Sequence, residues 1–499
     1  MSFLDLLKNS FNKTYTHNFA ETNISSLSGV IDLFAVMGAS RLKTDDELLK
    51  YFIDAWRESP ELTAKSIMYL RDIRKGIGER EVFRKYINIM IKQNHTLTAI
   101  EILKTIPELG RWDDIIYIWH HNKENKNISD FTKNIILEQL EKDKKFDNVS
   151  LLAKWLPSEN TSSKNTRNIA RELIKLLNIN AKEYRKTLSA LRKKIKLVEN
   201  NLREKDYTFD YSKVPSIAMR KYSKAFIRND EERYKQFFEY VKSGKVKLNT
   251  SVLTPFDVIR EILDCPEEDI DSRKEEFDLT WKNLPNIFVD NDLNAIVACD
   301  VSGSMGMALN GEPLICSVAF AIYTAQLNKS AFHNHFIDFC GNSKMHDISN
   351  INNIADIVDY VLRSSVDYST NIDSVFKALL DTALKNHVPQ EELPKYIIII
   401  SDMEFNQCEM QNKTNFEYWK ESFSKNNYKL PRIIFWNVNS LSRIMPALKN
   451  DDVLFISGRS QNALKNIINI DKYNLTNQDE ISMLLILDTL KDYSIDIKD

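Results

Sequence analysis

The sequence predicts a chain of two parts, an α-helical repeat region followed by an α/β domain with a mostly parallel central sheet. Two observations predict this fold class. In residues 1–290 apolar side chains recur three and four positions apart, which is typical of amphipathic helices. From residue 294 short apolar runs alternate with helical segments, which is typical of a parallel sheet. A chain of 499 residues is long enough for two or three domains.

The first part, residues 1–290, is predicted to consist almost entirely of helices joined by short polar turns. The helical periodicity is clear in residues 24–37, 47–56 and 82–91. Successive helices of about 10 to 15 residues indicate a solenoid of stacked helical pairs, although no strict sequence repeat is present. Residues 264–276 are acidic and contain a proline, so we expect a surface loop or linker there, before a domain boundary at residue 290.

The second part, residues 291–475, is predicted to alternate between strands and helices. The expected strands are residues 295–299, 335–340, 396–400, 432–436 and 453–456, and the expected helices are residues 313–327, 354–362, 372–384, 416–423 and 461–470. Residues 476–499 are predicted to form one more helix, at 478–490, which packs on either domain.

Composition excludes several classes of protein. The chain is 43% hydrophobic and 28% charged, which is typical of a globular protein. No apolar run approaches the ~18 residues of a membrane span, and the N-terminus lacks the core of a signal peptide, so we expect a cytoplasmic protein with no membrane partner. The five cysteines are widely spaced and the histidines show no ligand spacing, so neither a disulfide framework nor a zinc site is expected.

Oxygen-bearing side chains follow the predicted central strands. One loop offers three of them at every second position, and two later loops offer one each. Because ligands bind outside the carboxyl ends of parallel strands, these loops are predicted to meet at one edge of the sheet. Carboxylates and hydroxyls suit Mg²⁺ or another divalent cation, whereas the alternative for the first loop is a capped helical turn. The predicted metal ligands are Asp300, Ser302, Ser304, Thr370 and Asp402.

The segments DVSGS, STN and SDME resemble the metal-ion-dependent adhesion site of von Willebrand factor A (vWA) domains, whose pattern is DxSxS, a Thr and an Asp. The resemblance covers residues 290–475 and implies a Rossmann-like vWA domain in which the five residues bind Mg²⁺ and a partner's acidic group completes the coordination. Glu404 follows Asp402 by two positions and is not part of this pattern. It is either a group that supports the ligands or an intrinsic acidic occupant.

Two basic segments in the first part suggest that it binds a polyanion. Residues 71–84 contain four arginines and a lysine, with two glycines at a break before a helix, a combination that suits phosphate. The alternative is an inter-helical turn whose arginines pair with Asp72, Glu79 and Glu81. In the nearby IPELGRWDD turn, Trp112 is interpreted as a core anchor, and the two aspartates after it as caps of the next helix.

Residues 182–228 carry 14 basic and 5 acidic side chains, with aromatic residues between them. This pattern is typical of single-stranded nucleic-acid binding, although a solvated helix face is the alternative. Residues 291–499 carry 18 basic and 26 acidic side chains, whereas residues 1–290 carry 50 and 44, so the basic charge lies in the helical part. The candidate RNA-binding residues are Arg71, Arg74, Lys75, Arg80, Arg185, Lys186, Arg192, Lys193, Lys194, Lys196, Arg220, Lys221 and Lys224.

Longer segments extend the resemblance along most of the chain. RDIRKGIGER, IPELGRWDD, LAKWLPSE, YRKTLSALRKKI and SKVPSIAMRKYSKAFIRND resemble a family of plants, bacteria and large DNA viruses that joins a helical region to a vWA-like domain. In layout the chain also resembles the Ro ribonucleoproteins (TROVE-like), in which HEAT-like helical repeats form a ring beside a vWA domain. That resemblance implies a non-coding or misfolded RNA as a partner.

These observations predict a non-catalytic RNA-binding scaffold that also binds a protein partner through a Mg²⁺-dependent site. The alternative is a metal-dependent adaptor between proteins with no RNA role. Catalysis and a small-molecule substrate are not expected, because the sequence offers no nucleophile with a paired base, no second metal cluster and no GxxxxGK[ST] phosphate loop.

Overall fold

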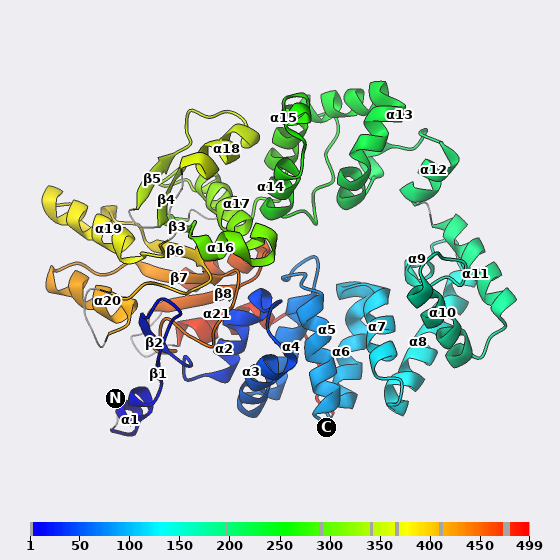
Figure 1. The fold of residues 1–499 in the computed structure, drawn as a ribbon, viewed down its shortest axis with the longest axis horizontal. Helices are drawn as coiled ribbons and strands as arrows, with labels where there is room; N and C mark the ends of the chain where they lie inside the picture. Colours follow the sequence, from blue (N-terminus) through cyan, green and yellow to red (C-terminus); the bar gives the residue numbers. More distant parts are fainter. Residues whose placement is uncertain are drawn as a thin grey trace. The chain divides into compact units, whose positions relative to one another are not determined.

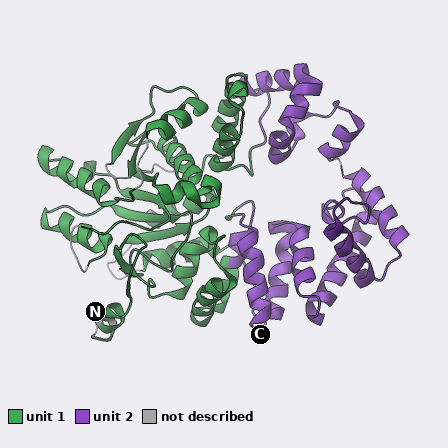
Figure 2. Cartoon of the chain, viewed as in Figure 1, with its two compact units in different colours: residues 1–66, 75–77, 250–493 green, residues 67–74, 78–249, 494–499 purple. Residues whose placement is uncertain are grey.

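The computed structural model describes residues 3–195, 197–288, 293–339, 343–364, 369–408, 413–472 and 480–498. The chain forms two compact units (Figure 2). Unit 1 combines residues 1–66, 75–77 and 250–493, and unit 2 combines residues 67–74, 78–249 and 494–499. This division differs from the expected boundary at residue 290, because the N-terminal residues and the helices after residue 250 pack with the sheet.

Unit 1 is organised around a six-stranded sheet with the order β5-β4-β3-β6-β7-β8 (Figure 1). The strands are β3 (Ala295–Asp300), β4 (His335–Phe339), β5 (Lys344–Asp347), β6 (Tyr396–Ser401), β7 (Arg432–Asn437) and β8 (Val453–Ser457). All neighbouring strands are parallel except β4 and β5, so the predicted mostly parallel sheet is confirmed. The sequence did not predict β5, because this short edge strand exposes three of its four side chains and shows no apolar run.

Helices cover the sheet on both faces. In β3 and β6 every residue is buried, as expected for central parallel strands. The helices of this part are α16 (Gly303–Met307), α17 (Glu312–Leu327), α18 (Ile354–Ser364), α19 (Asp373–Asn386), α20 (Asn415–Lys425) and α21 (Ile481–Leu490). Helix α17 packs on β3, β4 and β6, and α21 packs on β8 and so belongs to the sheet unit. The helix expected at residues 461–470 is instead two 3₁₀ turns, η5 (Gln461–Leu464) and η6 (Ile467–Lys472).

One segment of the described chain, Gly303–Leu327, is long and apolar enough to cross a membrane by composition, contrary to the expectation that none would be. More than half of its most apolar window is buried inside unit 1. Its backbone is also interrupted, because Leu309, Asn310 and Gly311 have left-handed conformations between α16 and α17. The segment therefore serves as the core helix of the sheet unit.

The N-terminal residues complete unit 1. Their elements are α1 (Phe3–Ser10), β1 (Lys13–Tyr15), β2 (Glu21–Asn23), α2 (Gly29–Val36), η1 (Met37–Ala39), α3 (Asp45–Glu58) and α4 (Pro60–Arg71). The antiparallel hairpin of β1 and β2 was not predicted, because its three-residue strands are too short to show a period. Helix α2 packs on β7 and β8, where the Ser457 hydroxyl donates to the Phe34 carbonyl and accepts the Gly38 N–H.

Residues 250–288 also belong to unit 1. The prediction of a loop or linker at residues 264–276 is wrong, because this stretch is mostly helical. Residues 250–288 form α14 (Pro255–Leu263) and α15 (Glu267–Lys282). The acidic residues that suggested a loop begin α15, where negative charge favours the helix N-terminus. Within this pair of helices the buried Arg273 forms ion pairs with Glu261 and Glu276, so part of the acidic charge is compensated internally.

Unit 2 is helical, as predicted. It contains α5 (Glu81–Lys92), α6 (Thr96–Leu109), α7 (Trp112–His121), α8 (Lys126–Lys145), α9 (Leu152–Trp155), α10 (Lys164–Leu177), α11 (Ala181–Lys194), α12 (Val198–Glu204), η2 (Tyr211–Lys213) and α13 (Ser216–Lys242). From α5 to α11 each helix packs on helices that are near it in the chain. This local packing is typical of stacked helical repeats.

Candidate metal centre

Asp300 and Asp402 lie at the carboxyl ends of two neighbouring strands in the middle of the sheet. Asp300 is the last residue of β3, and Asp402 directly follows β6. The strand order reverses between β3 and β6, because β4 and β5 lie on one side of β3 and β6 to β8 on the other. In open α/β sheets a ligand binds in the crevice outside the strand ends at such a switch point.

Hydrogen bonds hold the two carboxylates in place. Oδ1 of Asp300 accepts the N–H of Ser302 at 2.9 Å, and Oδ2 accepts the hydroxyl of Ser401 at 2.5 Å. The hydroxyls of Ser302 and Ser304 lie 3.2 Å apart. Oδ1 of Asp402 accepts the N–H of Glu404 at 3.1 Å. The Ser304 side chain, from the loop after β3, also hydrogen-bonds Asp402, so the ends of β3 and β6 meet at one point.

Both carboxyl groups are buried, and burial shifts the pKa of each toward the neutral acid. Burial raises the pKa of Asp300, although hydrogen bonds from Ser401 and Ser302 oppose the rise. Burial also raises the pKa of Asp402, and the negative charge of Asp300 raises it further. Two buried carboxylates this close are costly when both are ionised, and a divalent cation between them would offset that cost.

The donor set fits a hard cation. Oδ2 of Asp402 is buried and has no hydrogen-bond partner among the described residues. A buried acceptor of this kind is normally paired with a donor or a cation. No group of three or more His, Cys, Asp or Glu side chains that could hold a metal occurs in the described part of the chain. The candidate ligands are therefore two carboxylates and neighbouring hydroxyls, which Mg²⁺ accepts with water in the remaining positions.

Thr370, the fifth predicted ligand, comes from the loop before α19. Its side chain is buried, and its carbonyl accepts the N–H of Asn406 at 3.0 Å. The side chain of Asn406 donates to the Ser369 hydroxyl at 2.7 Å. The structure thus joins the loop of Thr370 to the loop after Asp402, while residues 365–368 of the predicted loop lie outside the described residues.

Two features of the site were not predicted from the sequence: Ser401, and a contact with the N-terminal segment around His17. Ser401 is fully buried and donates to Asp300, and the only signal for it was a hydroxyl directly before Asp402. The carboxylate of Glu404 accepts the N–H groups of His17 and Ser442 at 2.8 and 3.2 Å. Glu404 is therefore bound to the backbone of the N-terminal segment, 387 residues away, for which the sequence gives no signal.

The structure corrects the role of Arg71. This side chain is 1% exposed, and its guanidinium donates to Asp114 at 2.8 Å. Arg84 donates to the same carboxylate at 2.7 Å and to Asp113 at 3.1 Å. The two aspartates after Trp112 thus bind arginines in addition to starting α7, and Trp112 itself is a buried anchor as predicted. Arg71 is part of a buried ion network and does not face a polyanion.

The glycine break at residues 76–78 also has a structural role. The carbonyl of Gly76 accepts the Ser460 hydroxyl at 3.2 Å and the Asn462 amide at 3.0 Å. Residues 75–77 belong to unit 1, where they pack against the loop that follows β8. Of the two interpretations of residues 71–84, the contacts around Gly76 favour the inter-helical turn, and Lys75 forms an ion pair with Asp492.

The second basic segment keeps only part of its predicted surface. The guanidinium of Arg192 donates to the carbonyls of Ala153 and Leu156, so this arginine holds the end of α9. Arg185 pairs with Glu159, and Lys194 donates to the Phe146 carbonyl. Arg220 of the same segment is half-buried. In the first basic segment, Arg74 donates to the Glu108 carbonyl and Arg80 forms an ion pair with Glu81. Lys186, Lys193, Lys221 and Lys224 are exposed, and Lys196 lies outside the described residues.

None of the six described aromatic residues between these cations is fully exposed, because three are buried in unit 2 and the other three, Tyr207, Phe209 and Tyr222, are half-buried. Tyr184, Tyr211 and Phe226 are buried, and Tyr211 packs on Phe226 and Tyr234. A platform for stacked bases needs exposed rings. Any nucleic-acid surface here consequently depends on the exposed lysines.

Comparison with known proteins gives family matches over both parts. Residues 16–132 and 133–286 match a domain of unknown function (DUF2828), and residues 294–489 match a second domain of unknown function (DUF7788). The chain is 28% identical to Uncharacterized protein L728 of Acanthamoeba polyphaga mimivirus over 516 residues, which covers 95% of this chain and 87% of that protein. Among solved structures, the Deinococcus radiodurans Ro (RSR) protein is similar at 14% identity with a TM-score of 0.38, covering 89% of this chain and 98% of that one.

Proposed function

We propose that this chain, which belongs to the DUF2828 family, is a non-catalytic scaffold that holds a divalent cation at the carboxyl edge of its sheet and binds a protein partner through that cation. The observation that carries the proposal is the meeting of Asp300, Ser302, Ser304 and Asp402 at the switch point of the sheet. The same arrangement agrees with the vWA-like pattern of the sequence.

Each residue has a defined task in this proposal. Asp300 and Asp402 supply negative charge, and Ser302, Ser304 and Thr370 supply neutral oxygens. The two carboxylates and three hydroxyls fill only five of the roughly six positions around Mg²⁺, so one position is left for an acidic side chain of a partner. Binding is favoured over catalysis because the described hydroxyl that donates to Asp300, that of Ser401, is fully buried and is not open to a substrate.

Calorimetric titration of the full chain with Mg²⁺ tests the metal site. We expect one binding event in the wild type and its loss in Asp300→Ala and Asp402→Ala. Asp381→Ala, which removes an exposed carboxylate of α19, is the matched control and keeps the binding. Equal Mg²⁺ affinity in Asp300→Ala and the wild type would contradict the proposal.

A second function, RNA binding by unit 2, is favoured by four of the exposed lysines of α11 and α13: Lys186, Lys193, Lys221 and Lys224. Exposed lysines can contact phosphates, and such binding weakens steeply with salt. Fluorescence anisotropy with a single-stranded RNA oligonucleotide tests this function. We expect reversal of the four lysines to Glu to abolish binding at low salt, and reversal of the exposed Lys385 and Lys425 of unit 1 to leave it unchanged. Binding that survives the four reversals would reject this surface, and no measurable binding by the wild type at low salt would reject the function and leave the adaptor role alone.

A further inference from the structure

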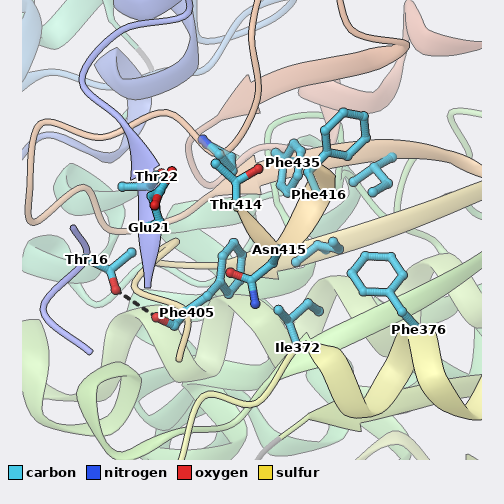
Figure 3. A pocket seen from close by; sticks show the side chains of 13 residues that line it. Thr16, Glu21, Thr22, Ile372, Phe376, Phe405, Thr414, Asn415, Phe416 and Phe435 are labelled. Carbon is cyan, nitrogen blue, oxygen red and sulfur yellow. Dashed lines mark hydrogen bonds between the residues drawn. The ribbon is translucent and has the colours of Figure 1, made fainter. Parts of the chain in front are cut away.

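The loop between β1 and β2, residues 16–19, lies on the metal side of the sheet unit and is called the N-terminal loop below. The Thr16 hydroxyl donates to the Phe405 carbonyl at 2.8 Å (Figure 3). The His17 N–H donates to the Glu404 carboxylate at 2.8 Å, and the Asn18 amide donates to the Glu404 carbonyl at 2.5 Å. Three successive residues thus bind the backbone or side chain of the segment directly after Asp402.

The N-terminal loop also reaches the third metal loop through one residue. Phe19 forms an antiparallel bridge with Asn406. The N–H of Asn406 donates to the carbonyl of Thr370. Asn406 therefore connects Phe19 to the loop that carries the predicted ligand Thr370. The N-terminal loop therefore contacts the loop after β6 directly, and that loop in turn contacts the loop of Thr370.

The residues around the N-terminal loop fix its position firmly. Thr16, Glu21 and Thr22 line a small cavity with Ile372, directly before α19, Phe376 of α19, and Asn415 and Phe416 of α20, as Figure 3 shows. The cavity measures about 10 Å³, which is room for about one water molecule. Lys13 of β1 binds Glu417 of α20 at 3.0 Å. The hairpin is therefore packed into unit 1 by its own side chains and does not hang free.

Phe19 is the exception to this packing. Its side chain is 75% exposed, and its backbone has a φ of 64°, a left-handed conformation that Asn or Gly adopts at lower cost. Neither folding nor turn formation benefits from an exposed phenyl ring at such a position. What distinguishes Phe19 from other exposed apolar side chains is its place beside the candidate metal centre, on a backbone that its neighbours hold by hydrogen bonds, and aromatic side chains are enriched among partner anchors.

We propose that the N-terminal loop is part of the docking face of the metal centre, and that Phe19 contacts an apolar side chain next to the partner's metal-binding Asp or Glu. The partner segment is thus a peptide with an acidic residue and an aromatic or aliphatic residue within a few positions of it. This inference rests on the proposed metal-dependent function. It adds a specificity-determining contact from residues that lie outside the vWA-like part of the sequence.

Selection from a random peptide library displayed on phage tests the inference. The full-length chain is immobilised in Mg²⁺, and bound phage are eluted with EDTA. We expect the eluted peptides to share an Asp or Glu with a neighbouring apolar residue. A synthetic consensus peptide is then titrated against the wild type, Phe19→Ala and Phe146→Ala. Phe146 is the control because it is a phenylalanine of unit 2 that is also largely exposed, at 63%.

We expect Phe19→Ala to weaken the consensus peptide about tenfold or more, and Phe146→Ala to leave its affinity unchanged. The Mg²⁺ affinity of Phe19→Ala should equal that of the wild type, because the side chain touches the partner and not the metal. Unchanged peptide affinity, a loss of Mg²⁺ affinity, or eluted peptides without apolar residues would each overturn the role of Phe19. If Asp300→Ala still binds the peptides, or if EDTA elutes none, the proposed function itself fails and the inference fails with it.

Discussion

The hydroxyl of Ser401 donates to Oδ2 of Asp300 at 2.5 Å, so the last residue of β6 fixes the carboxylate at the end of β3. The same hydroxyl accepts the N–H of Met403, which starts the turn around Asp402. One buried side chain therefore links both acidic residues of the candidate metal centre.

Ser401→Ala should weaken Mg²⁺ binding by roughly tenfold to a hundredfold, because groups that orient metal ligands have effects of that size. Ser401→Thr keeps the hydroxyl and should retain most of the affinity. Calorimetric titration with Mg²⁺ measures both. Ser482→Ala is the control, since it removes another buried hydroxyl of unit 1, one that donates to the Val453 carbonyl. An equal loss in Ser482→Ala would show a general effect on folding.

Gly38→Ala should destabilise the chain by about 1–3 kcal/mol or more, the usual cost of an overpacked contact. A Cβ at this position would lie 2.7 Å from the backbone of Ser457 and Gly458, which cannot move away without disturbing β8. Urea unfolding measures the free-energy difference. Gly306→Ala serves for comparison, because its Cβ would meet nothing closer than 3.8 Å, and its stability should change little.

Asp114→Ala should destabilise unit 2 by about 3–5 kcal/mol, since it leaves the buried Arg71 without its partner. Adding Arg71→Met to Asp114→Ala should recover part of this loss, because the uncompensated charge is then gone. Thermal unfolding of the single and double variants gives the coupling. A double variant that is less stable than Asp114→Ala would contradict the interpretation of Arg71 as a structural residue.

Asp32 should make stability depend on pH. Burial raises its pKa from 3.8 to about 6, against hydrogen bonds from Ser25 and Ser26 that favour the charged form. The folded state thus prefers the neutral acid, and this contribution is full below pH 4 and lost as the pH rises through 6. The difference of about two pKa units corresponds to roughly 2–3 kcal/mol.

Asp32→Asn removes this titration. Its stability relative to the wild type should therefore increase between pH 4 and pH 6 and stay constant above that range. Urea unfolding of both proteins at several pH values measures the difference. A relative stability that is independent of pH would show that Asp32 is ionised in the folded state throughout.

The sheet and the ends of its central strands could be predicted from local pattern alone. The strands β3 and β6 are apolar almost to their last residue, and a carboxylate marks the end of each. The ligand candidates Asp300 and Asp402 follow from that pattern because neighbouring parallel strands end at the same edge.

The partners of polar side chains could not be predicted in the same way. Arg71 and Asp114 lie 43 residues apart, and the segment around Arg71 offers other acidic residues that are closer in sequence. The N–H of His17 binds Glu404 across 387 residues, and a backbone donor carries no sequence signal at all. Local pattern therefore predicted the strand ends but gave Arg71 a surface role that its burial rules out.

The packing of α2 on β7 and β8 has a consequence for the order of events during synthesis. Seven of the eight residues of α2 are buried in the finished unit, and although α3 follows at once, the strands β7 and β8 that cover the rest of α2 emerge from the ribosome about 400 residues later. At roughly 5–20 residues per second, the apolar helix waits tens of seconds for the sheet that covers it. During that interval the nascent chain exposes a surface that holdase chaperones recognise, while the helices of unit 2, whose contacts are local, can already fold.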